Sequence, residues 1–183
     1  EYGVSLCLLD KIPMEGRMID GRVGYFTNKV RNYDNAVYDK GECEFISRWK
    51  LVPHREQLEA YLGGDLVEPI KPIVFYIDKQ IPTWLYPYVK RAVEAWQPAF
   101  ERAGFKNAIL ARPEPTYAED SVFSVDNARY AYISYKTSPL KNAYGPSSVD
   151  PRSGEILCSH IGIFNSISDL VQELYFCQAG AVD

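Results

Sequence analysis

The feature that most constrains the fold is a short apolar run followed closely by a long amphipathic pattern. Residues 73–77 read IVFYI, a continuous apolar stretch that is typical of a strand covered on both faces. Over residues 83–103 the apolar side chains recur every three or four positions, which predicts a helix with one apolar stripe. Gly104 is expected to end this helix, and Pro98 should kink it near Glu94 because proline has no amide hydrogen.

Four further segments with β character follow this helix, at residues 107–112, 129–135, 142–145 and 155–164. The single helix between the first two strands implies a right-handed parallel crossover. The later strands follow short turns, one of them at residues 148–154, so at least one strand can be antiparallel. A second helix is expected from Ser166 or Ser168 to about Gln178. We therefore expect an α+β (mixed α/β) fold, in which a twisted mixed sheet of about four or five strands packs against the first helix.

The chain divides into two expected regions. In residues 1–68, the segments 22–31 and 42–52 alternate in polarity on either side of turn-forming residues, so we expect a long β-hairpin followed by a linker. Residues 55–62 are expected to form either a short helix or an ordered loop. The second region, residues 69–183, holds the sheet and its helices. The chain begins abruptly within an apolar stretch and ends as abruptly, so both ends look like cuts within a longer polypeptide.

Composition argues against several classes of partner. The net charge of −4 argues against a nucleic-acid groove, which requires a basic surface. No stretch of about 18 apolar residues occurs, so we expect no membrane span. The four cysteines include no CxxC pair; they allow three disulfide pairings in an oxidising compartment, and buried free thiols are the alternative. These cysteines are Cys7, Cys43, Cys158 and Cys177.

Few residues offer the chemistry of a catalytic centre. The chain has two histidines, His54 and His160, and neither belongs to an HExxH helix. Cys158 and His160 lie two apart on an expected strand, where they could share a metal or form a thiol-based pair, and a core or surface histidine is the simpler interpretation. The acidic residues of the 113–127 loop could supply paired carboxylates for glycoside hydrolysis, or could form a solvated face. They include Glu119, Asp120 and Asp126.

Five segments carry a resemblance to a known family. They are residues 22–26 (RVGYF), 71–77 (KPIVFYI), 95–105 (AWQPAFERAGF), 142–146 (NAYGP) and 150–157 (DPRSGEIL). Together they are similar to a group of large bacterial zinc-dependent metalloproteases of metzincin type. The first segment resembles the end of their pre-catalytic domain, and the others resemble the upper half of the catalytic domain. The resemblance implies a secreted, periplasmic or cell-surface setting, and hydrolysis of peptide bonds by a zinc-bound water in the parent protein.

The resemblance assigns no catalytic residue and no metal ligand to this chain. In that family two histidines of an HExxHxxGxxH-type helix hold zinc, and the glutamate between them acts on the bound water. That motif is absent here, so we expect zinc as a cofactor of the parent protein, none in this chain, and no activity from the chain alone.

One role of the family can be carried over, residue by residue, to an edge strand that binds the substrate. The matching residues are Asn142, Ala143, Tyr144 and Gly145. The resemblance implies that a peptide or protein substrate pairs with them as an extra antiparallel strand, and a turn-rich connector is the alternative.

Two rival functions and one assembly state are also predicted. The chain could be a non-catalytic module that binds a peptide or glycan near Tyr130, Tyr132 and Tyr144, or a self-contained hydrolase that uses the acidic loop. If the chain is truncated, an apolar face is left exposed, and self-association through that face is expected.

Overall fold

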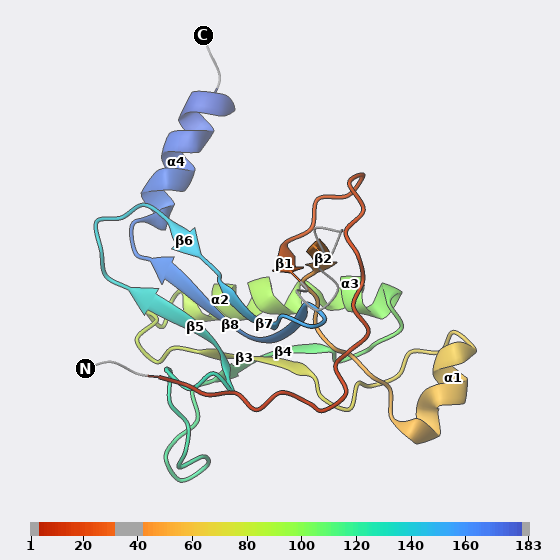
Figure 1. Ribbon diagram of the computed structural model, residues 1–183. Coiled ribbons are helices and arrows are strands. Elements are labelled where there is room, and N and C mark those ends of the chain that lie inside the picture. The colour runs from red at the N-terminus through yellow and green to blue at the C-terminus, as the bar shows by residue number, and fades with distance from the viewer. Residues whose placement is uncertain (1–3, 32–41, 181–183) are drawn as a thin grey trace.

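The computed structural model describes residues 4–31 and 42–180, which form a six-stranded sheet, a two-stranded hairpin and four α-helices (Figure 1). The strands of the larger sheet are β3 (Ile73–Ile77), β4 (Ile109–Pro113), β5 (Ala131–Lys136), β6 (Ala143–Tyr144), β7 (Ser147–Asp150) and β8 (Glu155–Phe164). Their order is β4-β3-β5-β8-β6, and β7 continues the β6 edge along β8. The first four strands are parallel, whereas β6 and β7 run antiparallel to β8. The predicted α+β fold with a mixed sheet is confirmed.

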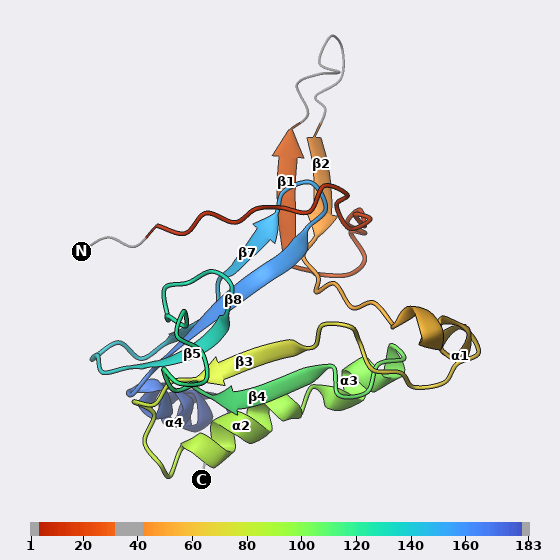
Figure 2. The same ribbon diagram turned by 90° about the horizontal axis from the view of Figure 1, so that it is seen from below.

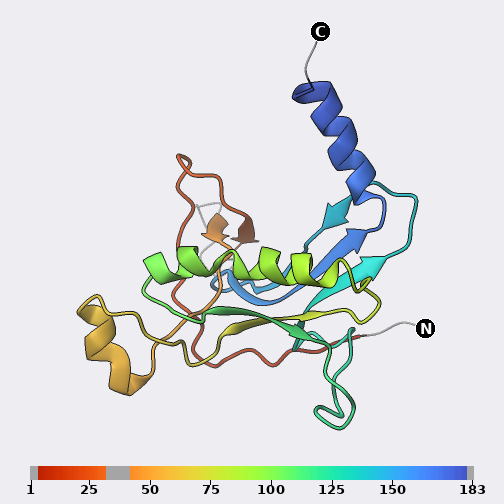
Figure 3. The same cartoon turned by 180° about the vertical axis from the view of Figure 1, so that it is seen from behind.

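The long helix of the sequence pattern is present in two pieces. α2 (Tyr86–Glu94) and α3 (Gln97–Arg102) are separated by Ala95 and Trp96, so the helix begins three residues later than predicted and is interrupted. The break falls next to Glu94, where the kink was expected, because Pro98 cannot donate the amide hydrogen bond that would continue the ladder. Figures 2 and 3 show both pieces running along the same face of the sheet.

Burial alternates along β3. Ile73, Phe75 and Ile77 are buried in the cluster that includes the apolar side chains of α2, whereas Val74 and Tyr76 are half-buried on the opposite side. The expectation that this strand is covered on both faces is therefore wrong in part: in the described residues, helices pack against one face.

The N-terminal region forms the predicted hairpin, in a shorter version. β1 (Thr27–Arg31) pairs antiparallel with β2 (Glu42–Ile46), and the expected turn at residues 32–41 lies outside the described residues. The first strand does not start at Arg22 because the chain turns there: the Asp20 carboxylate accepts a hydrogen bond from the Arg22 amide at 3.0 Å.

A crossing segment, residues 48–53, joins this hairpin to the sheet. The Ile156 amide of β8 donates to the Arg48 carbonyl at 2.9 Å, and the Ile70 amide donates to the Val52 carbonyl at 2.9 Å. Beyond the crossing, the segment that was expected to be a helix or an ordered loop is helical, as a short 3₁₀ turn that leads into α1 (Leu58–Leu62). The hairpin region is thus hydrogen-bonded to both β8 and the segment that precedes β3.

Two expectations near the C-terminus differ in outcome. The predicted turn at residues 148–154 is wrong in extent, because β7 reaches Asp150 and the turn occupies residues 151–154. Two serines give β7 a weak strand pattern, and pairing with the long β8 overrides it. The predicted helix is present as α4 (Ile167–Gln178), which projects away from the sheet in Figures 1 and 3. None of the helices in the described residues is long and apolar enough to cross a membrane.

Candidate functional site

The predicted site residues lie on the outer edge of the sheet. β6 and β7 together line the side of β8 that faces away from β5, and they are separated by Gly145 and Pro146. Within β6, Ala143 is opposite Ile163 and Tyr144 is opposite Gly162. Ala143 and Tyr144 therefore form a short paired strand, and Asn142 and Gly145 flank it.

The hydrogen bonds of this edge show which backbone groups face outward. The Phe164 amide donates to the Asn142 carbonyl at 3.4 Å, and the His160 amide donates to the Pro146 carbonyl at 3.1 Å. Because backbone groups alternate along an antiparallel strand, those of Ala143 and Gly145 point away from β8. The Ala143 amide donates to the Asn142 side chain at 2.8 Å. Within the described residues, the Gly145 amide and the carbonyls of Ala143 and Gly145 take no partner, so they can pair with another strand.

Packing fixes the one large side chain of this edge. The Tyr144 ring lies directly over Gly162, where an added Cβ would come within 2.5 Å of ring atoms. The ring centroid of Phe164 lies 5.8 Å away, and 42% of Tyr144 remains exposed. Gly162 therefore provides the space for the ring, and Tyr144 presents a fixed aromatic surface beside the free backbone groups.

The edge is also tied to the start of α4. Lys141 forms an ion pair with Glu173 of that helix, and the Ser138 amide donates to the Asn165 side chain at 2.8 Å. The hydrogen bond to Glu173 raises the pKa of Lys141. These contacts bring α4 and the edge strand together at one end of β8.

The other histidine and cysteine candidates do not form a metal centre. His160 and Cys158 lie on β8, where His160 Nε2 is 3.2 Å from the Tyr130 carbonyl oxygen and Cys158 is buried. His54 lies in a different region, just before the short 3₁₀ turn. Among the residues that the structure describes, no group of three or more His, Cys, Asp or Glu side chains could hold a metal ion. All four cysteines are free thiols in the structure.

The acidic loop uses its carboxylates to hold its own shape. Glu119 accepts hydrogen bonds from the Thr116 amide at 2.8 Å and from the Thr116 hydroxyl at 2.9 Å, and these bonds lower its pKa. Asp120 accepts a hydrogen bond from the Tyr130 hydroxyl at 2.6 Å. The Asp126 backbone carbonyl accepts one from Ser5 at 2.9 Å. Through these hydrogen bonds, the carboxylates of Glu119 and Asp120 have a structural role in the loop.

The three tyrosines of the alternative glycan site do not form one surface. Tyr130 and Tyr132 belong to an aromatic cluster with Tyr76 and Phe123, and Tyr132 is 5% exposed. Tyr144 packs elsewhere, over β8 at the outer edge. Of the three tyrosines, Tyr144 alone is both exposed and next to free backbone groups.

Sequence reasoning missed a polar cluster that forms where β3 and β4 end and β5 begins. Asp78 follows β3 and Glu114 follows β4, while the Tyr132 hydroxyl of β5 donates to Glu114 Oε2 at 3.1 Å. Burial first, and then the charges of Asp78 and Glu114, raise the pKa of Tyr132, so its hydroxyl stays protonated. The Asp78 carboxylate also accepts hydrogen bonds from the backbone amides of Gln80 at 2.8 Å and Tyr135 at 3.1 Å. A polar residue directly after an apolar strand was the available signal, and these bonds give the cluster a structural role.

Comparison with known proteins covers the hairpin region but not the edge. A family model described as a domain of unknown function (DUF5117) matches residues 1–54. No curated protein and no solved structure matches the chain. The matched residues end within the N-terminal region, so the edge strand lies outside them.

Proposed function

We propose that this chain is part of a zinc-dependent metallopeptidase, in which it supplies the scaffold and the edge that binds the substrate. The observation that carries the proposal is the antiparallel edge of β6 and β7 on an otherwise parallel sheet. Its outward groups at Ala143 and Gly145 are free to pair with a further strand. The substrate is a peptide or protein in extended form, and the proposed setting is the periplasm, surface or medium of a bacterium.

The places of the resembling segments in the fold support this proposal. Residues 71–77 include β3, residues 95–105 include α3, and residues 142–146 include the outer edge. Residues 150–157 form the turn and the first part of β8, to which β7 is paired. Four segments spread over residues 71–157 thus contribute to one sheet and its packed helix, as expected of parts of one domain.

In this proposal a bound peptide forms an additional antiparallel strand next to β6. The Gly145 amide donates to a peptide carbonyl, and the Ala143 and Gly145 carbonyls accept peptide amides. Side chains of a sheet point out of its plane, so they do not block the approach of a further strand. Tyr144 lies between the two outward-facing residues, and its ring packs over Gly162. Main-chain hydrogen bonds of this kind can bind peptides of many different sequences. Specificity for particular sequences would therefore come from side-chain contacts.

Zinc chemistry is not assigned to any residue of this chain. The described residues offer no set of three ligands, so they do not fit a zinc site by themselves. The proposal therefore gives this chain the task of holding and aligning the peptide. A zinc-bound water, which attacks peptide bonds in enzymes of this class, would have to be supplied by another part of the parent protein.

Backbone pairing can be tested by altering the peptide. The parent protein is incubated with an unmodified extended peptide and with peptides that carry N-methyl groups at alternate amides. N-methylation at the positions that pair with Ala143 and Gly145 should reduce binding about tenfold or more, since each lost hydrogen bond costs about 0.5–1.5 kcal/mol and the methyl group also blocks approach. Methylation of the intervening amides should have little effect.

Variants at Gly145 provide the matched protein control. Gly145→Ala should retain binding, because its Cβ would lie 3.6 Å from Ile161, an ordinary contact. Gly145→Pro removes the outward donor and should weaken binding. Zinc-dependent cleavage by the parent protein supports the peptidase. Peptide binding without such cleavage would favour the non-catalytic module, and insensitivity to every N-methyl group would refute the edge as the binding site.

A further inference from the structure

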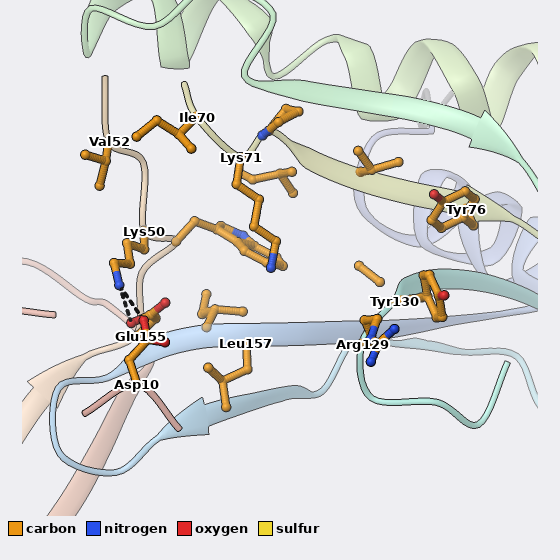
Figure 4. A pocket seen from close by; sticks show the side chains of 16 residues that line it. Asp10, Lys50, Val52, Ile70, Lys71, Tyr76, Arg129, Tyr130, Glu155 and Leu157 are labelled. Atoms are coloured by element: carbon orange, nitrogen blue, oxygen red, sulfur yellow. Dashed lines mark hydrogen bonds and ion pairs between the residues drawn. The ribbon is translucent and has the colours of Figure 1, made fainter. Parts of the chain in front are cut away.

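A hollow of about 920 Å³ opens where the sheet lacks a strand (Figure 4). β5 lies between β3 and β8, but it begins only at Ala131, opposite Phe75. Before that point none of the described strands fills the space between the start of β3 and the start of β8. The crossing segment, residues 48–53, runs from β8 to the segment that precedes β3 and closes one end. The hollow is thus lined by five parts of the chain, one of them Asp10, and is separate from the outer edge.

Backbone hydrogen bonds hold these walls in place. The Arg48 amide donates to the Gly154 carbonyl at 3.0 Å, and the Ile156 amide donates back to the Arg48 carbonyl at 2.9 Å. At the other side, the Ile70 amide donates to the Val52 carbonyl at 2.9 Å. The positions of the walls are therefore set by backbone hydrogen bonds of the fold. The volume of the hollow lies within the range of about 300–1,000 Å³ that is common for small-molecule sites.

Much of the lining is apolar. Trp49 contributes its ring, which also packs edge-on against Phe75 with centroids 6.1 Å apart. Ile70 and Val74 line the side of β3, and Leu157 lines the side of β8. Burial of an aromatic or branched aliphatic group of a ligand in this space would contribute favourably to the free energy of binding.

The charges of the lining leave a net positive balance. Lys50 is already compensated, because Nζ lies 2.9 Å from Asp10 Oδ2 and 3.8 Å from Glu155 Oε2. Lys71 and Arg129 reach the hollow from two other walls, and neither takes part in an ion pair among the described residues. Figure 4 shows Lys71 directed into the hollow and Arg129 near its far end. Three cations against two carboxylates leave one positive charge.

We propose that this hollow binds a monocarboxylate that carries an aromatic or branched aliphatic group. The carboxylate would lie between Lys71 and Arg129, and the apolar group would lie against Trp49 and Leu157. One negative charge balances the single excess positive charge, whereas a dianion would leave a negative excess. This site is independent of peptide pairing at β6, so it goes beyond the proposed function.

Two closely matched probes test the proposal on the 183-residue chain by isothermal titration calorimetry. N-acetyl-L-phenylalanine carries the carboxylate, and N-acetyl-L-phenylalaninamide has the same apolar group without a charge. The acid should bind saturably and at least about tenfold more tightly than the amide, since hydrogen bonds to a charged group contribute about 1.5–3 kcal/mol. Equal affinities for the two probes, or no binding of the acid at millimolar concentration, would overturn the proposal.

Charge variants at the mouth locate the bound acid. Lys71→Met removes the charge but keeps an unbranched stem, and it should weaken acid binding several-fold without changing amide binding. Lys71→Arg keeps the charge and should retain affinity. Lys106→Met, at an exposed lysine outside the lining, is the matched control and should behave as the unaltered chain. Because Lys71 is exposed, circular dichroism should show all three variants folded. A loss of affinity in Lys106→Met equal to that in Lys71→Met would refute the site.

Discussion

At the scale of single residues, two aspartates form the same local ion pair in different surroundings. Asp150 binds the Arg152 side chain at 2.7 Å, and Asp20 binds Arg22 at 2.5 Å, with the same spacing along the chain. The Asp150 side chain is 3% exposed and that of Asp20 is 48% exposed. A pair that is screened by water contributes little to stability, so burial should decide which of the two matters.

We predict that Asp150→Asn lowers the free energy of unfolding by about 1–3 kcal/mol at pH 7, because it removes the charge from a buried, hydrogen-bonded carboxylate. The Arg152 hydrogen bonds hold the pKa of Asp150 below its ordinary value, so the folded state binds the proton less tightly than the unfolded state. The stabilisation is then fully present above the unfolded pKa of about 4 and is lost as the pH falls through the lower folded pKa. Urea unfolding measured between pH 7 and pH 2 should show that the difference in unfolding free energy between the variant and the unaltered chain decreases as the pH falls.

The exposed pair supplies the control for this prediction. The pKa of Asp20 is also lowered by its arginine partner, yet Asp20→Asn should leave the unfolding curve nearly unchanged at every pH, because both side chains are exposed. Equal destabilisation by the two substitutions would show that burial of Asp150 does not set its contribution.

At the scale of elements, the sequence predicted those whose pattern is local and strong. The apolar run of β3 and the three-to-four spacing over α2 and α3 identify a strand and a helix without reference to the rest of the chain. β7 could not be found this way, because Ser147 and Ser148 carry no strand pattern and pair only through β8. The cluster of Asp78, Glu114 and Tyr132 likewise depends on the order of β4, β3 and β5, which no single segment encodes.

α4 carries large apolar side chains that are exposed to solvent. Its apolar side chains recur at helical spacing, and Val171, Leu174, Tyr175 and Phe176 are all exposed. We predict that the chain self-associates through this stripe and that Leu174→Glu shifts it toward the monomer, because a charge in a closed apolar contact is costly. Light scattering over a range of protein concentrations, under reducing conditions because Cys177 is exposed, measures the change.

The matched control for this helix is Ser124→Glu, in the 113–127 loop. It adds the same charge at an exposed position outside α4 and should leave the association unchanged. A wild-type chain that stays monomeric at high concentration, or two variants with the same effect, would exclude α4 as the contact.

At the scale of the whole molecule, the boundary expected near residue 68 separates two regions that are in close contact. Arg152 of the β7–β8 turn donates to the Asp10 carbonyl at 2.8 Å, and Lys50 pairs with Glu155 of β8. The sequence indicated a hairpin and a sheet but not these links, because they join residues about 100 positions or more apart. Gly154 shows how close the approach is: a Cβ there would lie 2.4 Å from the Ile46 carbonyl oxygen.

These links predict that the two regions unfold together. Trp49 belongs to the crossing segment and packs against Phe75 in the core of the sheet. Trp49→Ala should therefore lower the stability of the whole chain by about 2–4 kcal/mol within a single calorimetric transition, since a large aromatic contact is lost at the junction. Trp84→Ala and Trp96→Ala remove exposed rings and should change the transition little. If Trp49→Ala instead displaced one of two separate transitions, the hairpin region and the sheet would be independent units, and the hollow between them would lose its fixed walls.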